Sequence, residues 1–140
     1  MTIEVGSQVP EFRVTVDAQA MKPMALLLRD PNPIHWDTSV VERLGLGDRP
    51  INQGPVNVAY VMNALINWTH NPGCIRRLTV RFLGNVLADD IIVAGGVVKA
   101  VRDSDERPER VADCEVWLDR SDGTRLLRGQ AVVGLSGSGR

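Results

Sequence analysis

The sequence lacks the features that mark membrane proteins, secreted proteins and nucleic-acid-binding proteins. Its formal net charge is −1, which excludes a strongly basic surface for nucleic acid. No apolar run approaches the length of a membrane span, and the first residues show no basic segment followed by an apolar one. We therefore expect a cytoplasmic protein with no secretory signal, no membrane segment and no nucleic-acid partner.

Cysteine is also scarce. Cys74 and Cys114 are the only two, and their spacing fits no metal site. We expect both to be small buried side chains in a reducing compartment. The chain has no internal repeat and no linker, so its 140 residues predict one domain over 1–135 and a disordered tail over 136–140.

Hydrophobic periodicity predicts a chain with both helices and strands. Apolar residues cover much of the circumference of the longest expected helix, so we expect that helix to be buried. The segments after it have the pattern of antiparallel strands, and a helix on one face of such a sheet is an α+β architecture. The expected elements are a strand over 12–16, helices over 22–29, 38–44 and 54–68, and strands over 75–83, 91–101, 111–119 and 125–135.

Prolines and an aspartate set the expected ends of the two shorter helices. Pro23 is expected in the first turn of the 22–29 helix, where its missing N–H does no harm. Pro31 and Pro33 are expected to stop that helix, because each disfavours helical geometry in the residue before it. Asp37 is expected to cap the helix over 38–44.

The segment RDPNPIHWD, residues 29–37, places a carboxylate and an imidazole five positions apart with two prolines between them. Because prolines restrict the backbone, Asp30 and His35 can be held near one working geometry. Both are residue types that transfer protons in enzymes. The amide of Asn32 has donors and an acceptor, so it can fix the loop or orient a catalytic group. The alternative is an ordinary Asx-Pro turn that ends a helix and is followed by a surface histidine.

A second candidate group lies at the start of the longest helix. The first N–H groups of a helix have no acceptor within it, and they lie at the positive end of the helix dipole. Pro55 has no N–H, so the N–H of Gly54 is the clearest candidate to stabilise a developing oxyanion. The alternative is a glycine that is needed only for a tight turn.

Residues 30–35, DPNPIH, resemble the signature D-x-N-P-[LIV]-H of the MaoC-like dehydratases, which include the R-specific enoyl-CoA hydratases. A match at all five specified positions arises by chance on the order of once in 10⁴ chains of this length. The layout is similar from roughly Phe12 to Val133. The resemblance implies a single hotdog fold, in which a curved, mainly antiparallel sheet wraps a long central helix.

The resemblance also implies a hydro-lyase of fatty acid metabolism that reversibly adds water to a 2-enoyl-CoA with R stereochemistry at C3. Asp30 and His35 would hold one water, and either of them could act as the base while the other returns the proton. The Gly54 N–H would bind the thioester oxygen, and neither a metal nor a redox cofactor is required. The side chains expected to meet the substrate are Asn32, Trp36, Asn52 and Gln53.

Two positions depart from the pattern of the family. Gln53 precedes Gly54 where relatives commonly have histidine, which leaves the backbone donor intact but alters the expected acyl pocket. Arg29 precedes Asp30 where relatives often carry glycine, and we expect its side chain to point to solvent.

Three other functions stay open. A hotdog acyl-CoA thioesterase would also use a carboxylate and a helix N-terminus, but it does not explain the full Asp-Asn-Pro-His spacing. The chain could instead be the catalytic subunit of a heteromeric steroid-CoA hydratase, or a module that only binds acyl thioesters. The resemblance implies a homodimer that joins two sheets, with a heteromer of two hotdog chains as the alternative.

Overall fold

The computed structural model describes residues 2–135, so the tail expected over 136–140 lies outside the described residues. Within this range, one strand comes first, the helices follow it, and strands alone complete the chain. In chain order the elements are β1 (Gln8–Thr15), α1 (Ala18–Leu28), the short 3-10 helix η1 (Pro33–His35), α2 (Thr38–Arg43), α3 (Gly54–Thr69), β2 (Ile75–Phe82), β3 (Ile91–Asp103), β4 (Arg110–Arg120) and β5 (Arg125–Gly134).

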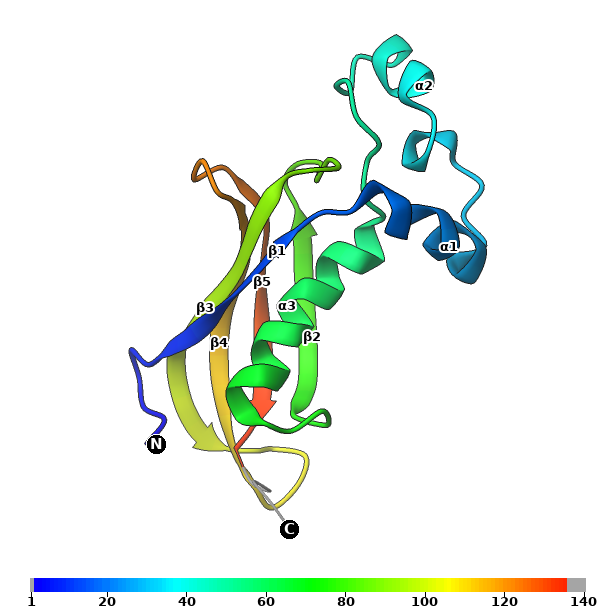
Figure 1. Cartoon of the computed structure of the whole chain (residues 1–140). Coiled ribbons are helices and arrows are strands. Elements are labelled where there is room, and N and C mark those ends of the chain that lie inside the picture. Colours follow the sequence, from blue (N-terminus) through cyan, green and yellow to red (C-terminus); the bar gives the residue numbers. More distant parts are fainter. Residues whose placement is uncertain (1, 136–140) are drawn as a thin grey trace.

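The strands form one antiparallel sheet in the order β1-β3-β4-β5-β2. Strands β3, β4 and β5 pair in chain order, whereas β1 and β2 occupy the two edges. The long strands curve along α3, which lies on one face of the sheet (Figure 1). A long helix wrapped by a curved antiparallel sheet is the hotdog fold, so the predicted α+β class and architecture are confirmed.

The core lies between α3 and the sheet, which together we call the body. The sequence of α3 contains no charged residue, and its Val61, Ala64 and Leu65 are buried against apolar side chains of the strands. The sheet is tightly packed at Gly129, where an added Cβ would lie 2.3 Å from the Thr79 carbonyl oxygen. Only glycine fits that position without a backbone shift.

Two expectations from composition can be compared with this structure. Cys74 and Cys114 are both buried free thiols, as expected, and burial raises the pKa of Cys114 to about 12. Among the described residues, no helix is both long enough and apolar enough to cross a membrane.

Between β1 and α3 the chain leaves the sheet and forms what we call the arm, residues 18–49. The arm contains α1, η1 and α2 and lies beyond the sheet, next to the first turn of α3 (Figure 1). Its only buried side chains are Met21, His35 and Val41. The arm therefore has little core of its own, and the residues of the DPNPIH motif lie within it.

The boundaries of α1 differ from the prediction. The helix begins at Ala18 because the Asp17 carboxylate caps it, accepting a hydrogen bond from the Gln19 N–H at 2.8 Å. The prediction that Pro23 lies in the first turn was therefore wrong, and Pro23 sits inside the helix. The helix ends at Leu28, and the left-handed backbone of Arg29, with φ of 52°, turns the chain before the prolines are reached.

Candidate active site

Asp30 and His35 are separated by a short turn that its own polar groups stabilise. The Asp30 carboxylate accepts a hydrogen bond from the Asn32 N–H at 3.1 Å, and the Asn32 side chain accepts one from the Ile34 N–H at 3.3 Å. These contacts start η1, whose last residue is His35. The backbone between the two titratable residues is thus fixed by local hydrogen bonds as well as by proline.

The Asp30 and His35 side chains are in direct contact. His35 Nε2 lies 3.0 Å from Asp30 Oδ2, and His35 Nδ1 lies 2.6 Å from the Ile51 carbonyl oxygen. The His35 side chain is 7% exposed, whereas that of Asp30 is 35% exposed. Solvent therefore reaches the pair mainly through Asp30.

The number of donors and acceptors determines how many protons this pair holds. A carbonyl oxygen only accepts, so His35 Nδ1 carries a hydrogen and donates it to Ile51. The contact between Nε2 and Oδ2 also needs a hydrogen, because an unprotonated ring nitrogen and a carboxylate are both acceptors. A hydrogen bond across this contact therefore requires one shared proton, either as imidazolium beside carboxylate or as neutral imidazole beside carboxylic acid. Such a pair can accept one proton and return it, as an acid–base step requires.

The Ile51 carbonyl belongs to an extended segment, residues 50–53, which we call the strap. It runs between the arm and the body and bonds to both. On the arm side, the Ile51 N–H donates to the Ile34 carbonyl at 2.9 Å. On the body side, the Asn52 N–H donates to the Val86 carbonyl at 2.7 Å. The strap therefore fixes the orientation of His35 and leads directly into α3.

Two arginines around the buried Asp90 carboxylate form an ion cluster that stabilises the start of the strap. The Asp90 carboxylate accepts hydrogen bonds from the Leu87 N–H at 2.9 Å and from Arg120 Nε at 3.2 Å. Arg49 Nη2 lies 3.4 Å from the same carboxylate, and Arg49 Nη1 donates to the Ala88 carbonyl at 2.6 Å. Because Arg49 immediately precedes the strap, this cluster attaches the strap to the loop between β2 and β3.

Gly54 is the first residue of α3 and follows the strap directly. The N-cap residue, Gln53, makes no side-chain cap hydrogen bond, and Pro55 has no N–H, so the Gly54 N–H is the first donor that this turn presents. A Cβ at position 54 would lie 3.3 Å from the Phe82 ring. The absence of a side chain at Gly54 therefore lets the Phe82 ring pack closely against the start of α3.

The side chains of Asn52 and Gln53, both expected to meet the substrate, are buried in contacts with the protein. Gln53 Nε2 donates to the Met21 carbonyl of α1 at 2.9 Å, and its Oε1 has no hydrogen-bond partner among the described residues. Asn52 Nδ2 donates to Asn57 Oδ1 at 2.9 Å and to the Tyr60 hydroxyl at 3.1 Å. Burial raises the pKa of Tyr60, so its hydroxyl keeps its hydrogen. The contact of Gln53 with the Met21 carbonyl therefore connects α1 to the start of α3. The contacts of Asn52 with Asn57 and Tyr60 attach the strap to α3 itself.

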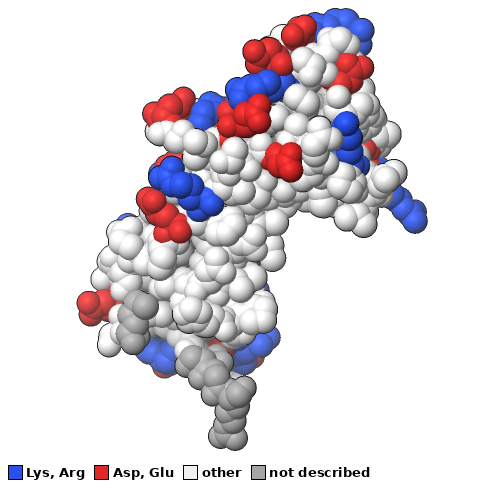
Figure 2. Space-filling view, viewed as in Figure 1, with Lys and Arg blue, Asp and Glu red and all other residues white. Residues whose placement is uncertain are grey.

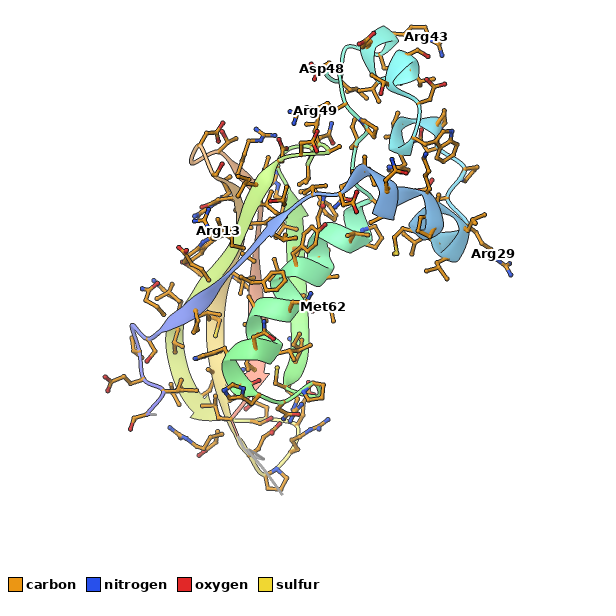
Figure 3. All side chains as sticks on the ribbon, viewed as in Figure 1. Arg13, Arg29, Arg43, Asp48, Arg49 and Met62 are labelled. Carbon is orange, nitrogen blue, oxygen red and sulfur yellow. The ribbon has the colours of Figure 1, made fainter. Side chains whose placement is uncertain are left out.

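The other two expected substrate contacts, Asn32 and Trp36, lie on the exposed surface of the arm. Trp36 is 41% exposed and, together with Asp30, lines an open groove of about 660 Å³. The side-chain oxygen of Asn32 accepts from the Ile34 N–H, so this residue shapes the turn. Arg29 is exposed at the outer end of the arm, as expected, and it also lines this groove (Figure 3).

Some contacts of this site carry no sequence signal. Every residue has a backbone carbonyl, so nothing in the sequence marks those of Ile51 and Met21 as partners of His35 and Gln53. Sequence reasoning also missed Tyr60. A signal for Tyr60 exists, because Asn57 and Tyr60 are three positions apart and so share one face of α3.

No curated protein matches the sequence. Among solved structures, the (R)-hydratase from A. caviae involved in PHA biosynthesis is similar with a TM-score of 0.82 and 24% identity, covering 96% of this chain and 98% of that one. R-hydratase PhaJ1 from Pseudomonas aeruginosa has a TM-score of 0.78 at 19% identity, with coverages of 94% and 81%. The ChsH1–ChsH2 complex from Mycobacterium tuberculosis gives 0.79 at 20% identity, with coverages of 96% and 98%. At these identities the likeness shows a shared fold.

The family described as MaoC like domain has a sequence profile that matches residues 4–117. The matched range contains the arm, the strap and α3, and therefore every residue of the candidate site. Because the match covers most of the chain, this protein belongs to the MaoC-like domain family.

Proposed function

We propose that the protein is an R-specific 2-enoyl-CoA hydratase, which reversibly adds water to the double bond of an α,β-unsaturated acyl thioester. The observation that carries this proposal is the 3.0 Å contact between Asp30 and the buried His35, because it creates a pair with one shared proton. The two R-hydratases among the structural neighbours support the same class of reaction. The R stereochemistry comes from this family resemblance.

In the proposed reaction, Asp30 is the base because it is the more exposed member of the pair. Its carboxylate takes a proton from water, whose oxygen forms a bond to C3. The π electrons of the C2–C3 bond move toward the thioester carbonyl, and the Gly54 N–H donates to the oxygen as it becomes negative. His35 Nε2 gives its proton to C2, and the proton on Asp30 then passes to His35. The pair ends the turnover with the one proton it held at the start.

The four remaining site residues have supporting roles in this proposal. Trp36 borders the acyl group next to Asp30, and Asn32 fixes the turn that carries both catalytic side chains. Asn52 and Gln53 hold the backbone that leads into Gly54, through contacts with α3 and α1 respectively. They therefore act on the substrate through the position of Gly54.

We also propose that the protein works as a homodimer in which a second copy covers α3. The surface over α3 shows mainly uncharged side chains, whereas charged ones gather along the margins of this face (Figure 2). Met62 of α3 and Phe82 and Leu83 at the edge strand β2 are exposed apolar residues that a partner would bury. The alternative is a heteromer with a second hotdog chain, which the ChsH1–ChsH2 complex supports. Light scattering of the purified protein distinguishes a dimer from a monomer.

The reaction is tested by incubating the purified protein with crotonyl-CoA and following the loss of the enoyl-thioester absorbance. We expect hydration, with a product that an R-specific but not an S-specific 3-hydroxyacyl-CoA dehydrogenase oxidises. Asp30→Asn serves as the inactive control, since an amide cannot take the proton from water. Turnover of Asp30→Asn equal to that of the wild type would overturn the assignment.

The same assay separates the rival functions. Release of free coenzyme A, detected with a thiol reagent, would identify a thioesterase. Cys74 and Cys114 are buried, and the raised pKa of Cys114, about 12, keeps it protonated, so the protein's own thiols add little to that signal. Binding without turnover would identify an acyl-binding module. Activity that appears only after a second hotdog chain is added would identify the subunit of a heteromer.

A further inference from the structure

The groove beside Asp30 is far larger than the smallest enoyl substrate needs. It is open, has a volume of about 660 Å³, and its walls include the apolar side chains of Ala25, Leu26, Pro31 and Trp36. Pockets of roughly 300–1,000 Å³ typically hold ligands of drug size. A crotonyl group has a single methyl beyond C3, so it would leave nearly all of this groove empty.

The groove walls also expose large apolar side chains to solvent. Leu26 is 82% exposed and Trp36 is 41% exposed, and both face the same groove as Asp30. Covering such side chains with an apolar group removes their surface from water and is favourable. The phosphates and adenine of coenzyme A gain nothing from apolar walls, whereas an acyl group does.

The order of the reacting atoms decides which part of the substrate reaches this groove. In the proposed reaction the oxygen on C1 lies at the Gly54 N–H and C3 lies at Asp30. The acyl chain from C4 onward therefore continues past Asp30, and Asp30 itself is part of the groove wall. The sulfur and coenzyme A leave from C1, on the other side of the reacting atoms.

We propose that this groove binds the acyl group beyond C3 and adapts the protein to bulky, branched or ring-bearing apolar acyl groups. This inference depends on the proposed hydratase function, whose active site provides the order of atoms used above. An open groove with apolar walls accommodates the width of a ring as well as the length of a chain. Short linear enoyl-CoA thioesters are then poor substrates, because they reach the catalytic pair but contact almost none of the groove.

The chain offers a matched pair of variants to test this. Leu26 and Leu27 are adjacent in α1 and are 82% and 76% exposed, but only Leu26 lines the groove. We would measure kcat/KM with crotonyl-CoA and with 3-cyclohexylprop-2-enoyl-CoA for the wild type, Leu26→Asp and Leu27→Asp.

The wild type is expected to prefer the cyclohexyl substrate. Leu26→Asp is expected to reduce that preference roughly tenfold or more, since small changes in an apolar pocket alter discrimination by such factors. Leu27→Asp leaves the preference as it is.

Lys22 and Arg29 also line the groove, and cations there could attract the phosphates of coenzyme A instead. The cyclohexyl acyl group on N-acetylcysteamine, which has no phosphate, separates these two sources of binding. The dependence on Leu26 is expected to persist with this truncated thioester. Loss of that dependence would show that coenzyme A, and not the acyl group, occupies the groove.

Other results would overturn the proposal. A wild type that prefers crotonyl-CoA, or an equal loss of preference in both variants, excludes an acyl site at Leu26. A dimer that becomes a monomer in Leu26→Asp but not in Leu27→Asp would show that a second copy covers the groove.

If the wild type hydrates no thioester, the proposed function fails, and the groove is judged separately by calorimetric binding of saturated 3-cyclohexylpropanoyl-CoA. Binding that Leu26→Asp weakens and Leu27→Asp does not would still support the acyl site. Binding that is absent, or equal in both variants, would overturn it.

Discussion

The arm and the body of this protein are stabilised in different ways. In the body, strand ladders and a continuous apolar core join β1 to β5 with α3, so each residue is supported by many neighbours. The arm has only three buried side chains, and individual polar contacts attach it to the rest of the chain. Two of these contacts are His35 to the Ile51 carbonyl and Gln53 to the Met21 carbonyl. A substitution in the arm should therefore alter geometry and activity, while one in the body should alter stability.

The largest effect is expected from the acid–base pair of the arm. Asp30→Asn and His35→Ala should each lower kcat/KM for the preferred enoyl-CoA by about 10²–10⁴-fold, as loss of a general acid or base typically does. Because the two residues share one proton, the double variant should lose about as much as either single variant. The enoyl absorbance assay measures all three. Urea unfolding should show little change for Asp30→Asn, whereas His35→Ala should also lose stability, because it removes the buried contact with the Ile51 carbonyl.

Glu42→Gln is the matched control, since it removes an exposed carboxylate from α2 of the same arm. It should keep full activity. Losses in the double variant that equal the product of the two single losses would contradict a pair that works as one unit.

A substitution in the core of the body is expected to lower stability and to leave activity unchanged. Leu65 of α3 is fully buried in the core, and Leu65→Ala should lower the free energy of unfolding by about 2–5 kcal/mol. The activity of the molecules that remain folded should not change, because Leu65 belongs to the core cluster and lies toward the far end of α3 from Gly54. Urea unfolding followed by tryptophan fluorescence measures the loss. Asn67→Ala, at an exposed position of the same helix, should cost far less, and an equal loss would exclude burial as the cause.

The arm and the body also differ in how much of their structure could be predicted from the sequence. Periodicity predicted the helix Gly54–Thr69 and the strands that follow it to within two residues at each end, because burial on one face imposes a regular pattern. Strand β1 was predicted four residues too short at its start, because a register shift between Val9 and Phe12 interrupts the alternation.

In the arm, the motif predicted that Asp30 and His35 are held near one geometry, and their side chains lie 3.0 Å apart, but the motif could not predict what orients them. Those partners are backbone carbonyls brought close by the fold, and no residue type marks them. The start of α1 was missed for a related reason, since the cap at Asp17 outweighed the proline signal at Pro23.

Gln53 connects the two regions, so its replacement tests whether arm geometry and body stability can be separated. Methionine is similar in size but lacks the N–H that donates to Met21, and it removes the buried Oε1 that has no partner among the described residues. Gln53→Met should therefore change the free energy of unfolding by less than about 1.5 kcal/mol. It should lower kcat/KM roughly tenfold, because α1 loses its attachment beside Gly54 and small displacements of catalytic groups are costly.

Gln19→Met makes the same exchange at an exposed position of α1 and should leave both quantities unchanged. A Gln53→Met protein that loses stability but keeps its activity would show that the contact supports only the fold.

The smallest expected effect comes from a feature that the arm and the body share. Arg29 ends α1 and His70 ends α3, and both have a left-handed backbone, with φ of 52° and 53°. This conformation costs a non-glycine residue about 1–2 kcal/mol, part of which glycine loses again through its greater freedom in the unfolded chain. Arg29→Gly and His70→Gly should therefore each raise the free energy of unfolding by up to about 1 kcal/mol.

Arg29→Ala and His70→Ala, which keep the Cβ, should give no gain. Because the cost is local, the two glycine variants should give similar gains in urea unfolding, although the two helices are stabilised so differently. A gain confined to His70→Gly would mean that the arm unfolds separately before the body does, and that its backbone does not contribute to the measured transition.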